Sequence, residues 1–485
     1  MPAFSLEPEQ TAWCAELRAL AAGRLRPLAE KGEPGHVNRA LVAELGRLGL
    51  LRRLFTSGAL DLCLMRESLA YACTEAETAL ALQGLGAHPV HAHGTEAQRR
   101  RWLPAVTEGT AIAAFALSEP GAGSDAAALT LAADGDSGAG SGGPAGKGPD
   151  GPTEVPPGGR GAAVAEGHNQ VETGPGGRFE VPQEGRDAAV AEGHNPVETG
   201  PGGRFEVPPE GRDAAVAEGG GPAGIGPGTS GEGPPEGRDA VAEGDGPGRW
   251  RLTGEKCWIS NAPEADFYTV FARTTPGAGA RGVTAFLVPA DRPGLTGRPL
   301  EMLSPHPIGA LRFDGVPVTG DDVLGEVDRG FAVAMGTLNL FRPSVGAFAV
   351  GMAQAALDAT LAHTARRDAF GGTLRDLQAV SHQVAEMALR TEAARLMVYA
   401  AASAYDDKAP EVPRRAAMAK LLATETAQFV VDTAVQLHGA RALQRGHLLE
   451  HLYREVRAPR IYEGASEVQR GIIAKELYAR LEATP

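Results

Sequence analysis

The stretch FALSEPGAGSD, residues 115–125, joins a short apolar run to a Pro-Gly turn and two more small residues. Such a turn lets the backbone approach a ligand closely, and Ser118 and Ser124 offer hydroxyl groups that could bind it. A β-turn with polar residues on its surface would show the same pattern. The stretch also marks the place where the periodicity of the sequence changes.

Before this stretch, up to about residue 112, the sequence is typical of helices. Leu41, Leu45, Leu48 and Leu51 follow one another at spacings of four and three, which predicts one apolar helix face. The segment TEAQRRRW, residues 95–102, opens with Thr95 and has Gln98 three residues later, with Pro104 just beyond. This pattern predicts a helix that begins with a capping box and ends near the proline.

After residue 113, short apolar runs are separated by Gly, Pro and Asp, and they predict strands of a mostly antiparallel sheet or barrel. From about residue 325 the helical spacing returns, as in 377, 380, 384 and 387, and the long apolar segments are typical of a bundle. We therefore expect an α+β chain with three parts. These are an N-terminal helical domain (1–112), a middle β domain (113–324) and a C-terminal helical bundle (325–485).

The stretch KCWISNA, residues 256–262, carries an indole and a hydroxyl two positions apart on a predicted strand. Trp258 and Ser260 would then point to the same face. An indole beside a hydroxyl could cover one side of a planar ring and bond to its edge. The alternative is a tryptophan packed in the core of a barrel.

The stretch RIYEGASEVQRGIIAKEL, residues 460–477, places Glu463 between an aromatic residue and a glycine, just before a predicted helix that Ser466 could cap. An apolar setting disfavours the charged form of a carboxyl group, which suits a general base that works near neutral pH. A glutamate near the start of a helix can instead serve only to offset the helix dipole.

Residues 134–249 differ from the rest of the chain. They hold 33 of the 65 glycines, 20 acidic and 8 basic residues, so they contribute −12 to a net charge of −14. AAVAEGHN begins at residues 162 and 188, and GGRFEVP begins at 176 and 202, which gives a repeat of 26 residues. Each repeat offers too few apolar side chains to fold, and we interpret the segment as a disordered insert at the tip of a hairpin. It is either a passive expansion or a tether for a partner. The GxGxxG at 138–143 has no helix after it, so we reject a dinucleotide site there.

The bulk composition argues against several classes of function. No basic stripe is present that could bind nucleic acid, and the four cysteines show no metal-ligand spacing. No 18-residue apolar run or signal-peptide pattern occurs, so we expect a cytoplasmic protein without a membrane span or a metal.

The three stretches in this order resemble the acyl-CoA dehydrogenase family. The resemblance extends to GTEAQRRRWLP, RRDAFGGTLRDLQAVSHQVAEMA and VQLHG, and it covers about 370 residues, nearly the whole chain outside the insert. It implies a helical N-terminal domain, a middle β domain and a C-terminal four-helix bundle. It also implies FAD as cofactor, an acyl-CoA substrate, an electron-transfer flavoprotein as acceptor, and a homo-oligomer, by family habit a tetramer.

The resemblance also implies roles for single residues. Glu463 matches the catalytic base, and the alternative position used by some members is Phe341 here, which cannot act as a base. Three positions that usually contact FAD or CoA depart from the family pattern, namely Asn339, Ala440 and Ala465. Matches to substrate positions are Ser124, Arg342 and Gly464, and matches to FAD positions are Phe115, Leu117, Ser118, Trp258, Ser260, Arg367, Phe370, Gln378, Gln436 and Gly439. Of these, Arg367, Phe370, Gln378 and Gln436 match residues that hold the ADP half of FAD on a neighbouring subunit, which implies an oligomer.

The sequence leaves other functions open. An acyl-CoA oxidase of related fold, or a dehydrogenase of acyl chains bound to a carrier protein, would carry the same motifs. A different class is an inactive scaffold whose acidic repeat recruits partners. Chain length and branching of the acyl group are not determined by these motifs.

Overall fold

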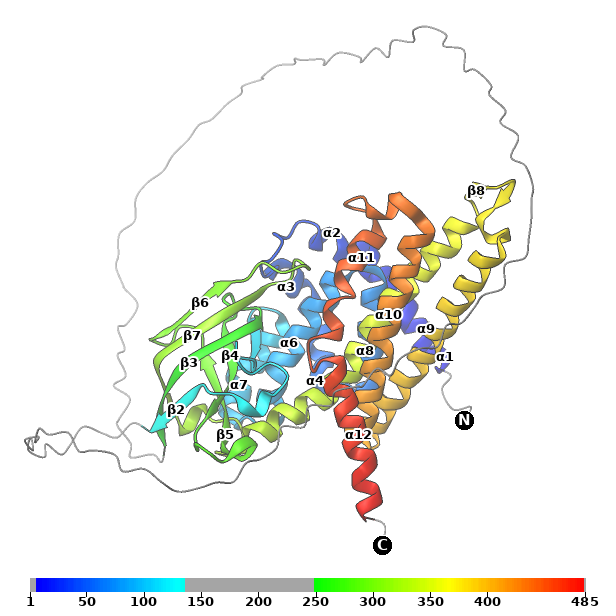
Figure 1. The fold of residues 1–485 in the computed structure, drawn as a ribbon. Coiled ribbons are helices and arrows are strands. Elements are labelled where there is room, and N and C mark those ends of the chain that lie inside the picture. Colours follow the sequence, from blue (N-terminus) through cyan, green and yellow to red (C-terminus); the bar gives the residue numbers. More distant parts are fainter. Residues whose placement is uncertain (1–5, 136–247, 484–485) are drawn as a thin grey trace, which may run out of the picture. The chain divides into compact units, whose positions relative to one another are not determined.

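The computed structural model describes residues 6–135 and 248–483 (Figure 1). Most of the predicted insert, with its 26-residue repeats and the GxGxxG, therefore lies outside the described residues. The described residues form helices, then a sheet, then helices again, in the order that the sequence predicts.

The first part of the chain is helical, as predicted, but the leucine run at 41–51 is two helices rather than one. Gly49 separates them with φ of 73°, a left-handed conformation that glycine adopts without steric cost. Leu41, Leu45 and Leu51 are buried on both sides of this break. The helices are α1 (Pro8–Leu20), α2 (Arg26–Ala29), α3 (Arg39–Arg47), α4 (Leu50–Thr56), α5 (Ala59–Ala72), α6 (Thr74–His93) and α7 (Glu96–Glu108).

The capping box at the start of α7 is confirmed. The Gln98 backbone N–H donates to Thr95 Oγ1 at 3.2 Å, and the Gln98 side chain accepts from the Thr95 backbone N–H at 2.7 Å. The predicted end is wrong, because Pro104 lies inside the helix, which continues to Glu108. Gly109 ends it in a left-handed conformation, with φ of 74°.

The middle part forms one twisted sheet, and most neighbouring strands run antiparallel as predicted. The pairs β1–β4 and β2–β4 are parallel. The sequence pattern did not predict β6, because its residues are mostly exposed and do not alternate between apolar and polar. Such a pattern is possible in a strand at the edge of a sheet. The order is β1-β4-β2-β3-β7-β6, with β5 paired to β4. The strands are β1 (Ala113–Ala116), β2 (Ala132–Gly135), β3 (Arg249–Ser260), β4 (Phe267–Arg273), β5 (Val283–Pro289), β6 (Leu295–Pro299) and β7 (Ile308–Thr319).

The strands on either side of the insert pair with each other. β2 and β3 run antiparallel, from Ala132 opposite Thr253 to Gly135 opposite Trp250. The chain therefore leaves this hairpin and returns to it at adjacent positions, which fits an insertion at the hairpin tip.

The last part is the predicted helical bundle, in which α8 is central and packs against α5, α9 and α10. Among the described residues, one helix, α8, is long and apolar enough to cross a membrane. However, 72% of its most apolar 18-residue segment is buried inside the fold, as expected for the core helix of a bundle. A two-stranded turn, β8 (Asp368–Ala369) with β9 (Gly372–Thr373), joins α8 to α9. The helices are α8 (Gly330–Thr364), α9 (Gln378–Asp406), α10 (Val412–His438), α11 (Leu448–Glu455) and α12 (Ser466–Ala483).

Candidate functional site

A buried ion pair fixes the turn at 115–125. Lys256 of β3 is fully buried, and its Nζ lies 2.9 Å from Glu119 Oε1 and donates to the Leu117 carbonyl at 2.9 Å. Glu119 also accepts from the backbone N–H groups of Thr130 and Leu131, at 2.6 and 2.9 Å. These bonds offset the desolvation of both charges, and the pKa of Glu119 is lowered because the Lys256 charge and these donors outweigh burial.

The same contact brings two predicted FAD stretches together. The Cys257 backbone N–H donates to the Ser118 carbonyl at 3.0 Å, so the turn lies beside residues 256–260. The prediction that Trp258 and Ser260 share one face assumed a regular strand, in which side chains alternate between the two faces. The strand is irregular here, because Trp258 has φ of 57° and the pairing with β7 shifts register between Lys256 and Ile259. Trp258 is 48% exposed and is not a core tryptophan.

The loop before α12 holds Glu463 in a strained backbone conformation. Glu463 has φ of 52° and Gly464 has φ of 97°, two left-handed residues in succession. A side chain at position 464 would come within 2.4 Å of Gln469 Nε2. The Arg342 side chain of α8 donates to the Glu463 carbonyl at 3.1 Å, so two residues predicted from the resemblance are in contact.

The carboxylate of Glu463 has a buried oxygen, Oε2, without a hydrogen-bond partner in the described part of the chain. Burial raises the pKa of Glu463, and the positive charges of Arg66, Arg342 and Lys420 oppose this rise. A carboxylate that is desolvated, unpartnered and near three cations can accept a proton from a substrate that enters the site.

Arg66 and Lys420 were not found from the sequence. Arg66 of α5 is buried, pairs with the buried Glu77 through Nε, and donates to Ser344 Oγ of α8 at 2.7 Å. A charge pair whose members come from different helices leaves no short-range pattern. The one signal was the position of Arg66 between two apolar runs, LCLM at 62–65 and LAYAC at 69–73.

The residues predicted to hold the adenine half of FAD lie around one end of the bundle. Phe370 is 91% exposed, with φ of 53° in the turn between β8 and β9. The stacked rings of His363 and His438, 4.1 Å between centroids, join the end of α8 to the end of α10. Arg367 follows the end of α8, Phe370 lies in the turn between β8 and β9, and Gln378 begins α9. Gln436 and Gly439 lie at the end of α10.

Within the described residues, no hydrogen bond or ion pair joins Glu463 to Ser118 or Trp258, and Ser124 is an exposed turn residue. Phe115 packs against Phe271, with ring centroids 4.9 Å apart. The predicted residues at the turn and β3 are thus not bonded directly to those at the loop before α12, and the residues at the end of the bundle form a third group. In the part of the chain that is described, no group of three His, Cys, Asp or Glu is arranged to hold a metal.

Three family models match successive parts of this chain. The N-terminal domain of acyl-CoA dehydrogenase matches residues 7–110, the middle domain matches 235–316, and the C-terminal domain matches 328–478. The middle-domain match does not include the turn at 115–125.

Two curated relatives are similar over about half of this chain. A probable acyl-CoA dehydrogenase, FadE25, of Mycobacterium tuberculosis is 39% identical over 239 residues, which are 49% of this chain and 61% of the relative. The mitochondrial short-chain specific acyl-CoA dehydrogenase of Homo sapiens is 41% identical over 239 residues, 49% of this chain and 57% of the relative. The aligned part thus spans about three fifths of the length of these relatives.

The solved structures agree over the full fold. Butyryl-CoA dehydrogenase from Megasphaera elsdenii superposes on this chain with a TM-score of 0.71 at 25% identity. The superposition covers 98% of this chain and 99% of the butyryl-CoA dehydrogenase chain. A glutaryl-CoA dehydrogenase in complex with glutaryl-CoA has a TM-score of 0.70 at 23% identity, covers 98% of this chain and 96% of its own, and supports the fold alone. With helices, sheet and bundle in the same order and all three domain models matched, the chain belongs to the acyl-CoA dehydrogenase family.

Proposed function

We propose that this chain is an FAD-dependent dehydrogenase that converts an acyl-CoA thioester to the 2-enoyl-CoA, with Glu463 as the base. The observation that carries this proposal is the buried, unpartnered Oε2 of Glu463 in a strained loop surrounded by three cations. A residue that only offset the dipole of α12 would not need an unsatisfied buried oxygen.

The chain's own residues fit a flavin. Trp258 and Phe370 are large aromatic side chains that are exposed and held in a left-handed backbone conformation, so their ring faces are available for stacking. A side chain at Gly439 would meet no atom within 4 Å, so a ligand can approach the backbone closely there. Trp258, Ser118 and Ser260 would hold the ring system, and the predicted residues at the bundle end would hold the adenine half.

In the proposed reaction Glu463 removes a proton from the α-carbon of the acyl group, and its Oε2 receives that proton. Burial favours the uncharged product of this step, because a protonated carboxyl is easier to desolvate than a carboxylate. The positive charges of Arg66, Arg342 and Lys420 favour the ionised form of Glu463 and oppose the effect of burial, which raises its pKa. FAD, when bound, supplies the acceptor for the β-hydrogen and its electron pair.

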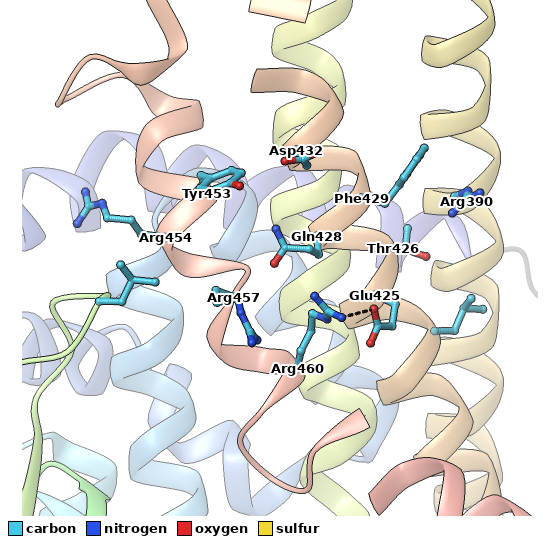
Figure 2. Close-up of a pocket in the computed structure, with 12 residues that line it drawn as sticks. Arg390, Glu425, Thr426, Gln428, Phe429, Asp432, Tyr453, Arg454, Arg457 and Arg460 are labelled. Atoms are coloured by element: carbon cyan, nitrogen blue, oxygen red, sulfur yellow. Dashed lines mark ion pairs between the residues drawn. The ribbon is translucent and has the colours of Figure 1, made fainter. Parts of the chain in front are cut away.

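We further propose that the chain works as a homo-oligomer, because a groove of about 910 Å³ lies beside the catalytic loop on α9, α10 and α11. Figure 2 shows arginines and acidic residues side by side in this groove, including the ion pair between Arg460 and Glu425, 2.9 Å apart. Leu303 and Tyr453, also in the lining, are 62% and 44% exposed. A surface that mixes both charges with exposed apolar groups can pair with its own copy about a two-fold axis.

The substrate and the acceptor are the finer part of this proposal. A short acyl-CoA is the first substrate to test, since one relative is described as short-chain specific and one solved structure as a butyryl-CoA dehydrogenase. An electron-transfer flavoprotein is the proposed acceptor.

The test is anaerobic addition of a panel of acyl-CoAs and carrier-bound acyl groups to the purified flavoprotein. Loss of the oxidised-flavin absorption with an acyl-CoA is the expected result. Bleaching by carrier-bound chains alone would instead favour the biosynthetic enzyme, and peroxide formed in air without another acceptor would favour an oxidase. A protein without bound flavin would contradict the proposal.

A further inference from the structure

Three donors from three helices meet at two successive backbone carbonyls in the loop that carries Glu463. Arg342 of α8 donates to the Glu463 carbonyl at 3.1 Å, and Lys420 of α10 donates to the Gly464 carbonyl at 2.7 Å. The Gln469 side chain of α12 donates to both, at 3.2 and 2.9 Å. The two carbonyls belong to the two left-handed residues of the loop.

Lys420 is unusual among these donors. Its side chain is fully buried, yet within the described residues it forms no ion pair with a carboxylate, and it donates its hydrogen bond to a neutral carbonyl. A buried ammonium group is costly unless nearby groups compensate it. Burial lowers the pKa of Lys420 to about 8, and the negative charge of Glu463 has the largest opposing effect on this pKa. The base is therefore the main electrostatic partner of the Lys420 ammonium group.

We propose that Lys420 is a positioning residue for the base: Lys420 holds the Gly464 carbonyl and supplies a positive charge near the Glu463 carboxylate. This role rests on the proposed function of Glu463. Two consecutive left-handed residues relax unless the surrounding structure holds them, and Lys420 ties this loop to the bundle core. A displacement of about 1 Å at a reacting group can lower the rate by about 10²-fold.

Several charges face this pair and set its titration. Arg66 of α5 and Arg342 of α8 are the other cations near Glu463. Glu425 of α10 and Glu467 of α12 act on Lys420 along with Glu463. Glu425 is itself bonded to Arg460 and Ser466, which leaves Glu463 as the carboxylate most affected by loss of the Lys420 charge.

The experiment compares Lys420→Met and Lys420→Arg with Lys475→Met, a change at an exposed lysine of α12, in the full-length flavin-loaded protein. We expect Lys420→Met to lower kcat by about 10- to 100-fold while KM changes by less than about 3-fold and flavin content is unchanged. The acid limb of its kcat profile should move to higher pH, because a cation that opposes the raised pKa of Glu463 has been removed. Lys420→Arg should recover part of the rate, and Lys475→Met should match the wild type.

Gln469→Leu separates the two parts of the role. It removes two hydrogen bonds to the same carbonyls without removing a charge, so kcat should fall while the acid limb stays in place. It also provides a readout if Lys420→Met does not fold, because unchanged kcat in Gln469→Leu would overturn the anchoring role. A Lys420→Met protein with wild-type kcat and an unshifted acid limb would overturn the inference alone. A wild-type protein that oxidises no acyl-CoA would overturn both the proposed function and this role.

Discussion

Lys256→Met should destabilise the fold strongly, because it leaves Glu119 buried without its cation. Removal of one partner of a buried ion pair costs about 3–5 kcal/mol. Glu119 keeps its bonds from Thr130 and Leu131, which favours the lower end of that range, while the lost bond to the Leu117 carbonyl adds about 1 kcal/mol. We therefore expect a loss of about 4 kcal/mol in the free energy of unfolding at pH 7.

Urea denaturation followed by tryptophan fluorescence measures this loss, with Lys475→Met as the exposed control. The sign of its pH dependence follows from the pKa of Glu119, which is lowered in the folded protein. Stability from such a group is present above its unfolded pKa and is lost as the pH falls through its folded pKa. The gap between wild type and Lys256→Met should thus narrow in acid. A loss below about 1 kcal/mol at pH 7, or a gap that widens in acid, would refute the structural role assigned to this ion pair.

Three further predictions concern the site itself. Gly464→Ala should lower activity by at least about 10-fold, because the new Cβ would lie 2.4 Å from Gln469 Nε2 and because alanine disfavours the left-handed conformation of residue 464. Normal steady-state rates would contradict this. Arg66→Met should move the acid limb of the kcat profile to higher pH, since Arg66 is the largest of the positive charges that oppose the raised pKa of Glu463; an unshifted limb would argue against this role. Trp258→Ala should weaken FAD binding by about 10-fold, the loss of roughly 1.4 kcal/mol of aromatic contact, while leaving thermal stability nearly unchanged because the side chain is 48% exposed; unaltered FAD affinity in a titration would count against the predicted flavin wall.

Much of the fold could be predicted from the sequence, because it depends on short-range patterns. Alternation and turn residues identified the long strands, and the spacing of apolar residues identified the helices. The errors arose where one residue overrides a pattern. Gly49 splits the leucine run into two helices, Pro104 is accommodated inside α7, and the bulge at Trp258 interrupts the alternation.

The site could be predicted only in part, because it is built from long-range contacts. The resemblance pointed to Glu463 and Arg342, which the structure places in contact. It gave no signal for Lys420 or Arg66, whose importance comes from burial beside Glu463, and burial of a charge is decided by helices that are far apart in sequence.

Glu463→Gln tests the central claim most directly. Glutamine keeps the size of the side chain but cannot take up a proton, so the variant should retain bound FAD and wild-type stability. In a stopped-flow experiment without oxygen, an acyl-CoA that bleaches the wild-type flavin should leave the flavin of Glu463→Gln oxidised, with a rate at least about 10³-fold lower, in line with the loss of an essential base. Bleaching at the wild-type rate in that variant would contradict the assignment of Glu463 as the base.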